Sequence, residues 1–167
     1  MNTTHLHIRE LTPDDWPSLK RIVIDFAQSP YHIYDHPFPH DDESLQALTR
    51  QFAASHLWFA VCLSDSPEMI GYVCFHRDGD RFDLGYCFHS AYHGRGYAHE
   101  ACAALMAELE RTHGAITFTA GTALDNTPSC RLLEKLGFVL TSTESVSFCR
   151  DDAGNDIVFT GGSFIRR

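Results

Sequence analysis

Apolar and polar residues follow two different periodicities at the start of the chain. Residues 5–11 alternate between the two kinds, which is the period of a strand with one buried face. Residues 12–15 then supply a Thr N-cap, a proline at the first helical position and two acids, the residue types that begin helices. A helix is therefore expected to follow the strand, because apolar residues continue at helical spacing at Trp16, Leu19, Val23 and Phe26.

The next stretch predicts a loop, a shorter helix and a group of strands. Residues 29–42 are rich in proline, histidine and aspartate, whereas 43–54 have a helical pattern that Asp41 or Asp42 would cap. Short apolar runs then predict three strands, over 57–63, 69–76 and 81–89. The last two flank an Asp-Gly pair, which is typical of a hairpin turn.

Helices and strands continue to alternate in the second half. An apolar stripe predicts a helix that ends near Gly114, and β-branched and aromatic residues over 115–121 predict a strand. Asn126 would cap another helix, with Gly137 just beyond its end. The last predicted features are two strands, over 138–148 and 156–164, and a turn between them at 153–155. The order β-α-α-β-β-β-α-β-α-β-β predicts a mixed sheet of the α/β or α+β class.

Length and composition narrow the class of protein. The chain has 167 residues, of which 44% are hydrophobic, so one globular domain over 1–167 is expected. No apolar run approaches the roughly 18 residues of a membrane span, and the N-terminus lacks a secretory pattern, so neither membrane nor export is expected. Six cysteines occur singly, without a Cys-x-x-Cys pair, which indicates reduced thiols in a cytoplasmic protein.

The charge of the chain argues against a nucleic-acid partner. There are 13 Lys and Arg against 22 Asp and Glu, a net charge of −9, and no run of basic residues. The charge is also uneven. Residues 1–70 hold 4 basic and 10 acidic groups, a net −6, whereas 71–90, 91–137 and 138–167 each have a net charge of −1.

A glycine-rich junction follows the predicted strand over 81–89. Gly94 and Gly96 permit left-handed backbone, the N–H groups of the following helix form an anion cradle, and Arg95 adds a cation. A plain strand-to-helix turn explains the glycines as well. The segment is not a P-loop, because no Gly-Lys-Ser/Thr follows, nor a dinucleotide fingerprint, because the third glycine is missing.

A second motif lies over 126–138. It begins with Asn126 and has Ser129 in the first turn of the predicted helix. Taken alone, both residues need only be capping groups. The two motifs together nevertheless occur at a spacing that capping does not explain.

The combination resembles the GNAT acetyltransferase superfamily, in particular the branch of the ribosomal-protein N-terminal alanine acetyltransferases. The superfamily's acetyl-CoA signature, Gln/Arg-x-x-Gly-x-Gly/Ala, is matched over 93–98 with His93 in place of its first residue. The branch's Gly-Tyr is present at 85–86, and its Asn-x-x-Ser…Glu-Lys-Leu-Gly-Phe is complete over 126–138. The likeness covers nearly the whole chain and is weakest at 29–56 and after 140.

This resemblance implies a fold and a cosubstrate. The fold is a mixed, mostly antiparallel sheet flanked by helices, whose fourth and fifth strands splay apart around acetyl-CoA; no metal is implied. The backbone of the fourth strand would pair with the pantetheine, the glycine-rich loop would hold the pyrophosphate, and the second motif would approach the pantetheine and the sulfur. The implied residues are, in that order, Tyr86, Cys87, Phe88 and His89; His93, Gly94, Arg95, Gly96, Tyr97 and Ala98; and Asn126 and Ser129.

Acetyl transfer to an amine by direct attack in a ternary complex sets three requirements. The amine must be neutral, the oxyanion needs N–H donors, and the departing thiolate benefits from a proton donor. We expect the Phe88 N–H, freed by a distorted strand, to serve the oxyanion, and the Ser129 hydroxyl to serve the thiolate, with Tyr86 as the alternative. Asp83 and Glu144 are candidate bases acting through water, unless binding simply selects the neutral amine.

The acceptor is expected to be a primary amine, either a protein N-terminus or a small molecule. The acidity of residues 1–70 favours a cationic acceptor, steered by charge. A non-catalytic acyl-CoA-binding module is the alternative, and a generic nucleotide-phosphate binder a third. Residues 31–40 would shape the acceptor pocket. Their histidines would align as metal ligands only on a helix, which the prolines oppose. An exposed strand near 156–164 would permit a homodimer.

Overall fold

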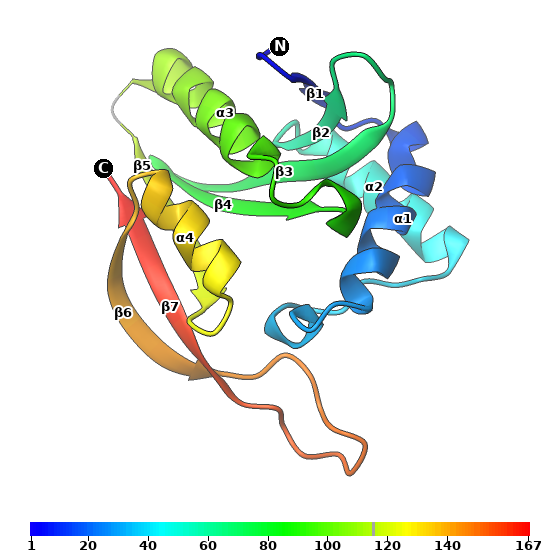
Figure 1. Ribbon diagram of the computed structural model, residues 1–167, viewed down its shortest axis with the longest axis vertical. Coiled ribbons are helices and arrows are strands. Elements are labelled where there is room, and N and C mark those ends of the chain that lie inside the picture. Colours follow the sequence, from blue (N-terminus) through cyan, green and yellow to red (C-terminus); the bar gives the residue numbers. More distant parts are fainter. Residues whose placement is uncertain (115) are drawn as a thin grey trace.

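The computed structural model describes residues 1–114 and 116–167, and its strands form a single sheet (Figure 1). The strands are β1 (Leu6–Glu10), β2 (Trp58–Leu63), β3 (Met69–Asp78), β4 (Arg81–Phe88), β5 (Thr117–Ala123), β6 (Val139–Val146) and β7 (Phe159–Arg166). Their order is β1-β2-β3-β4-β5-β7-β6, antiparallel throughout except for the parallel pair β4 and β5. The predicted mixed, mostly antiparallel sheet is therefore confirmed.

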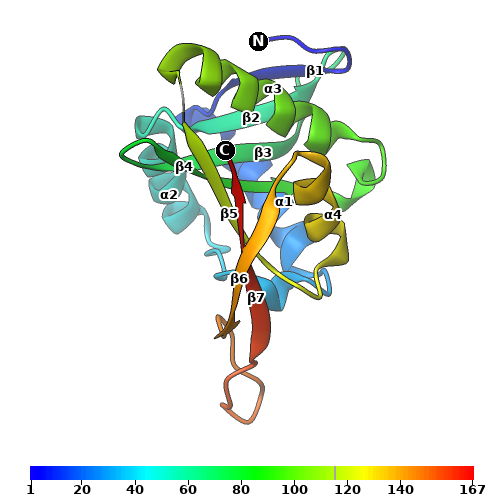
Figure 2. The ribbon, with the colours of Figure 1, turned by 90° about the vertical axis from the view of Figure 1, so that its left-hand side faces the viewer.

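Helices cover both faces of this sheet, in agreement with the predicted class. They are α1 (Trp16–Ala27), α2 (Asp42–Ala54), α3 (Tyr97–His113) and α4 (Thr127–Lys135), with short 3₁₀ turns η1 (Pro13–Asp15), η2 (His32–Tyr34) and η3 (Ser90–Tyr92). The pair α1 and α2 lies on one face and the pair α3 and α4 on the other (Figures 1 and 2).

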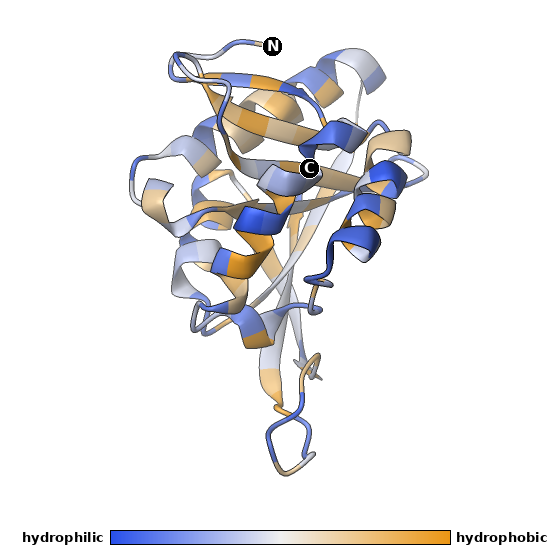
Figure 3. Cartoon of the chain, turned by 90° about the vertical axis from the view of Figure 1, so that its right-hand side faces the viewer, coloured by the Kyte–Doolittle hydropathy of each residue, from blue (hydrophilic) through white to orange (hydrophobic). Residues whose placement is uncertain are grey.

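Each face of the sheet has its own apolar core. The core under α3 and α4 includes Phe75, Phe82 and Phe118, and the core under α1 and α2 includes Leu19 and Trp58. Hydrophobic residues accordingly concentrate where strands and helices meet, whereas the outer helix surfaces are hydrophilic (Figure 3). Burial of this apolar area is the main force that holds the layers together. No helix within the described ranges is long and apolar enough to cross a membrane.

The predicted helix boundaries follow from local capping. Residues 13–15 form a 3₁₀ turn before α1, and the Asp15 carboxylate accepts hydrogen bonds from the N–H and hydroxyl of Thr12. Asp41, one of the two predicted caps, accepts the Ser44 N–H at the start of α2. The helix α3 ends at His113, next to Gly114, whose positive φ of 78° favours glycine.

The last three strands differ from their predicted limits. The strand expected over 115–121 is found at Thr117–Ala123, and residue 115 lies outside the described residues. The final strand pair, expected over 138–148 and 156–164, extends over Val139–Val146 and Phe159–Arg166. Residues 147–158 between them form an arm that projects from the body of the molecule (Figure 1) and turns at Gly154, within the predicted turn.

The centre of the sheet opens because β4 and β5 separate. They pair only from Arg81 to Asp83 on β4 and from Thr117 to Thr119 on β5. Both strands run in the same direction, so beyond these residues each has lost its partner on one side. The predicted splay of the fourth and fifth strands is confirmed, and it positions the site described next.

Candidate active site

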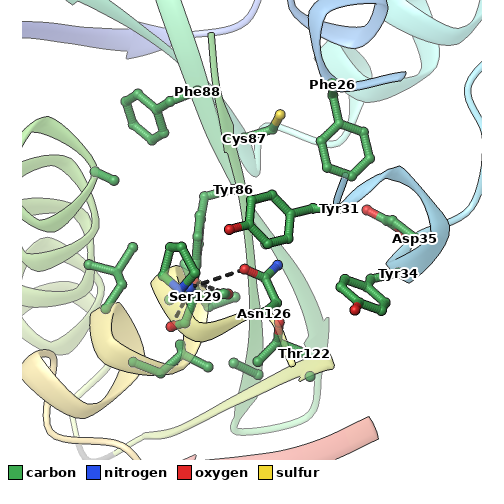
Figure 4. A pocket seen from close by; sticks show the side chains of 18 of the residues that line it. Phe26, Tyr31, Tyr34, Asp35, Tyr86, Cys87, Phe88, Thr122, Asn126 and Ser129 are labelled. Carbon is green, nitrogen blue, oxygen red and sulfur yellow. Dashed lines mark hydrogen bonds between the residues drawn. The ribbon is translucent and has the colours of Figure 1, made fainter. Parts of the chain in front are cut away.

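A cavity of about 1100 Å³ occupies the opening between β4 and β5. One wall consists of these two strands, the N-terminus of α3 and the first turn of α4. The facing wall consists of the end of α1, the segment that follows it, and two phenylalanines near the arm, Phe148 and Phe159. Figure 4 shows side chains from both walls directed into the space between them.

The register of β3 and β4 decides which backbone groups border this cavity. The His89 N–H donates to the Ile70 carbonyl on the β3 side, at 2.9 Å. Backbone groups along an antiparallel strand point alternately to its two sides, so those of Tyr86 and Phe88 point toward the gap left by β5. The Phe88 carbonyl accepts a hydrogen bond from His93 Nε2 at 2.7 Å. By the same alternation, the Phe88 N–H is directed into the cleft.

This alternation corrects two expectations. The backbone groups of Cys87 and the His89 N–H face β3, and the His89 carbonyl accepts from the Tyr92 N–H. Of the four residues expected to pair with pantetheine, only Tyr86 and Phe88 therefore have backbone groups that face the cleft. The expected strand distortion is also wrong, because β3 and β4 pair without a register shift. The Phe88 N–H is freed by the divergence of β5 instead.

The glycine-rich loop forms the open cradle that its sequence predicts. Gly94 and Gly96 have positive φ angles of 74° and 83°, and nothing lies within 4 Å of where a Cβ would stand. The helix α3 begins immediately afterwards, and the N–H groups of its first turn have no helical acceptor. Tyr97, Ala98 and His99 supply these groups, and all three line the cavity. The loop can therefore receive an anion through backbone N–H groups and the helix dipole.

Other residues of this loop hold it in place. Asp25 of α1 accepts hydrogen bonds from the Ser90 N–H (2.8 Å) and hydroxyl (2.6 Å), which ties the loop to the opposite wall. Glu100, after the loop, accepts bonds from Thr3 and His5 and is structural. Arg95 is exposed, with its guanidinium 6.0 Å from the ring centre of Tyr92, and it does not line the cavity.

Ser129 meets Tyr86 across the cavity floor. Their side-chain oxygens are 2.6 Å apart, and Asn126 Oδ1 accepts the Ser129 N–H as the cap of α4 (Figure 4). Burial raises the pKa of Tyr86 well above its ordinary value, although the bond to Ser129 opposes this. The phenol therefore stays protonated at neutral pH. The two candidate thiolate donors, Ser129 and Tyr86, form one hydrogen-bonded pair.

The two candidate bases border the same cavity in different settings. Asp83 lies at the closed end, where β4 and β5 still pair, and accepts a hydrogen bond from Thr119 Oγ1 at 2.7 Å. Glu144 lies on β6 and is exposed to solvent. The structure thus brings Asp83, Glu144, Ser129 and Phe88, which are distant in sequence, to one cavity.

The facing wall holds residues that the sequence analysis did not single out. Phe26, Tyr31, Tyr34 and Asp35 project into the cavity from the end of α1 and from η2 (Figure 4). The sequence predicts only that residues 31–40 as a whole shape the acceptor pocket, and Tyr31, Tyr34 and Asp35 lie within that segment. Within the described residues no group of three or more metal-ligating side chains is close enough to hold an ion.

Comparisons with known proteins agree with this geometry. Residues 5–139 match the family model described as the acetyltransferase (GNAT) domain. An uncharacterized N-acetyltransferase, YnaD of Bacillus subtilis, is 25% identical over 139 residues, covering 82% of this chain and 81% of YnaD.

Two solved structures share the fold. A GNAT-family acetyltransferase from Bacillus anthracis has a TM-score of 0.81 and 21% identity, over 99% of this chain and 96% of that chain. The ribosomal L7/L12 alpha-N-protein acetyltransferase RimL, solved with coenzyme A, has a TM-score of 0.79 and 18% identity, over 98% and 94%.

Proposed function

The chain belongs to the GNAT acetyltransferase family, and on that premise we propose that it moves the acetyl group of acetyl-CoA to a primary amine by direct attack in a ternary complex. The observation that carries the proposal is the placement of the Phe88 N–H and the Ser129–Tyr86 pair in one cavity between the splayed strands. These are the donors that thioester aminolysis needs, one for the oxyanion and one for the thiolate.

The residues around the cleft fit acetyl-CoA, which supplies an activated acetyl group when bound. The backbone groups of Tyr86 offer hydrogen bonds to an amide-rich chain such as pantetheine, whereas the Phe88 N–H is kept for the oxyanion and the Phe88 carbonyl accepts from His93. The loop at Gly94 and Gly96, with the first turn of α3, offers N–H groups to a pyrophosphate. Asn126 uses Oδ1 as a cap, so its amide nitrogen remains the group to approach the ligand. RimL was solved with coenzyme A, which supports this cosubstrate.

The chemistry then follows from the positions of these groups. The amine nitrogen forms a bond to the acetyl carbon, and the carbon–sulfur bond breaks. The Phe88 N–H stabilises charge on the carbonyl oxygen, and the Ser129 hydroxyl, polarised by the Tyr86 phenol, donates to the sulfur. The amine loses its proton to Asp83 or Glu144 through water, or enters already neutral.

The half-buried thiol of Cys87, in the cavity, is a poor nucleophile for a covalent enzyme intermediate. Cys87 lines the cavity, but burial raises its pKa to about 12. A thiol must ionise to act as a nucleophile. At neutral pH the Cys87 thiol therefore stays protonated, which is consistent with the direct attack proposed above.

An amine screen tests this function. Purified protein and acetyl-CoA are combined with polyamines, aminoglycosides, simple amines and peptides with free N-termini, and release of free CoA thiol is recorded. Peptides belong in the panel because RimL is named as an acetyltransferase of a ribosomal-protein N-terminus. We expect thiol release that depends on added amine. Tight CoA binding without amine-dependent turnover across the panel would instead identify an acyl-CoA-binding module.

A further inference from the structure

The wall of the cavity that faces Ser129 is built from a chain of aromatic contacts between distant segments. Its ring centres are separated by 6.4 Å for Tyr31–Tyr34, 5.0 Å for Tyr34–Phe159, 5.7 Å for Phe159–Phe148 and 4.2 Å for Phe148–His36. All five residues line the cavity, and we call them the aromatic wall. The wall joins the segment after α1 to the base of the arm.

A carboxylate lies within this aromatic wall. Asp35 lies between Tyr34 and His36 in sequence, and Figure 4 shows it beside Tyr34, on the side of the cavity away from Ser129. One of its oxygens, Oδ1, accepts the His36 N–H at 2.7 Å. Among the described residues no hydrogen bond reaches Oδ2. One oxygen is thus committed to the loop and the other is free.

The other carboxylates of the cavity are placed differently. Asp25 accepts two hydrogen bonds from Ser90, and Asp83 accepts one from Thr119 at the closed end of the cleft. Glu144 lies on β6, away from the aromatic wall in sequence, and is exposed to solvent, as Asp35 is. Only Asp35 combines a free oxygen with aromatic neighbours. Desolvation by the surrounding protein raises the pKa of the Asp35 carboxyl, and the hydrogen bond and charge of His36 oppose this.

We propose that Asp35 and the aromatic wall bind a second cationic group of the acceptor, apart from the amine that is acetylated. The preferred acceptor is then a diamine-like molecule with an apolar spacer. A carboxylate pairs with an ammonium, and aromatic faces attract the same cation. Because Asp35 and Ser129 lie on opposite walls, one ammonium can be held while the other end reaches the acetyl group. This inference rests on the proposed function, since both ends must occupy one cavity.

The test compares amines that differ by one ammonium group. Binding to the full chain with CoA present is measured by calorimetry for 1,4-bis(aminomethyl)benzene against 4-methylbenzylamine, and for 1,6-diaminohexane and 1,8-diaminooctane against the corresponding monoamines. We expect at least one diamine to bind roughly tenfold or more tightly than its monoamine, the scale of one charge-assisted contact. Equal affinities for every pair would overturn the proposal.

Asp35→Asn assigns the preference to this residue. The variant keeps an oxygen that can accept the His36 N–H and removes only the charge. It should lose the diamine preference while its affinities for monoamine and for CoA stay unchanged. Asp65→Asn, which removes the same charge from an exposed turn away from the cavity, is the matched control. A diamine preference that survives in Asp35→Asn excludes Asp35 as its source.

The binding assay also separates this inference from the proposed function. If diamines bind through Asp35 but no amine releases thiol, the subsite stands and acetyl transfer fails. If amines are acetylated and Asp35→Asn does not change diamine affinity, acetyl transfer stands and the subsite fails. A lower kcat in Asp35→Asn with diamine affinity unchanged would place Asp35 in the chemistry and not in recognition.

Discussion

Ser129 and Tyr86 are the two residues whose hydroxyl groups should have the most direct effect on the rate of acetyl transfer. Ser129→Ala removes the hydroxyl nearest the expected thiolate, and we predict that kcat falls by roughly 10- to 1,000-fold, the range for one positioned catalytic group. Tyr86→Phe keeps the ring and removes the 2.6 Å contact, so its effect should be smaller. Steady-state kinetics at saturating acetyl-CoA measure both.

The double variant tells whether the two hydroxyls act as a unit. If Tyr86 works only by polarising Ser129, then Tyr86→Phe adds nothing once Ser129 is alanine. Additive losses would show that Tyr86 acts on the sulfur independently. An unchanged kcat in Ser129→Ala would remove Ser129 from the mechanism.

Asp15 is the residue whose protonation should affect stability most clearly. Burial alone would raise its pKa, but hydrogen bonds from Arg9 (2.7 and 2.6 Å) and Thr12 outweigh burial and hold its pKa below the ordinary value of 3.8. A depressed pKa stabilises the fold above the unfolded-state pKa, and this contribution disappears as the pH falls through the folded-state pKa.

Asp15→Asn should therefore be destabilised at neutral pH and much less so in acid. We expect a loss of about 1–3 kcal/mol at pH 7, since one partner is half-exposed. The difference from the wild type should shrink below pH 4. Urea denaturation at several pH values measures it, with exposed Asp14→Asn as control. A difference that does not vary with pH would contradict the assigned role.

Individual residues differ in how far sequence can reveal them. Asn126 and Ser129 were identified because their roles depend on a motif within one short helix. Asp35 was not, because its setting depends on Phe148 and Phe159, which are more than a hundred positions away. The backbone of Cys87 was assigned wrongly because the pairing register with β3 determines which way each peptide group points, and residue types do not reveal it.

At the scale of elements, the loop between β4 and α3 should depend on glycine backbone. Gly96 caps α3 with φ 83° and has open space beside it, so Gly96→Ala causes backbone strain without a steric clash. We predict a lower melting temperature and at least several-fold weaker CoA binding, because the N–H groups of the loop shift.

Gly79→Ala provides the matched control for that prediction. Gly79 also has a positive φ, of 61°, with nothing within 4 Å, but it lies in the β3–β4 hairpin away from the cavity. It should lower the melting temperature to a similar extent and leave the CoA affinity unchanged. If both variants weaken CoA binding equally, the loss reflects general destabilisation and not the cradle.

Elements with local signals were predicted well, and those set by distant partners were not. The caps at Asp41 and Gly114 follow from short-range chemistry. The limits of β6 and β7 depend on mutual pairing, which ends at Val146 and Phe159, so the polar arm between them could not be separated from the strands by pattern alone. The splay of β4 and β5 was predicted from the family resemblance. The hydrophobic periodicity of a strand does not show where it stops pairing with its neighbour.

At the scale of the whole molecule, negative charge is concentrated in the first 70 residues, which supply part of the cavity wall that faces Ser129. Residues 1–70 have 4 basic and 10 acidic groups, a net −6 of the total −9. The cavity lining itself has four carboxylates, whereas its Lys and Arg side chains are Arg131 and Lys135 of α4. The proposed cationic acceptor would thus be attracted both at a distance and inside the cavity, whereas polyanionic CoA would depend on the local N–H groups of the loop at Gly94 and Gly96.

Ionic strength should therefore act differently on the two substrates. Raising salt from about 20 to 300 mM shortens the screening length from roughly 20 Å to below 8 Å, which removes long-range attraction for the amine. We predict that the KM of a diamine rises by about 3- to 10-fold and that the KM of acetyl-CoA does not rise with it. Steady-state kinetics at several salt concentrations measure both constants, and Asp35→Asn should show a weaker dependence for the diamine. A parallel rise in both constants would mean that salt acts on the protein as a whole, and a flat diamine KM would mean that the acidic N-terminal part does not steer the acceptor.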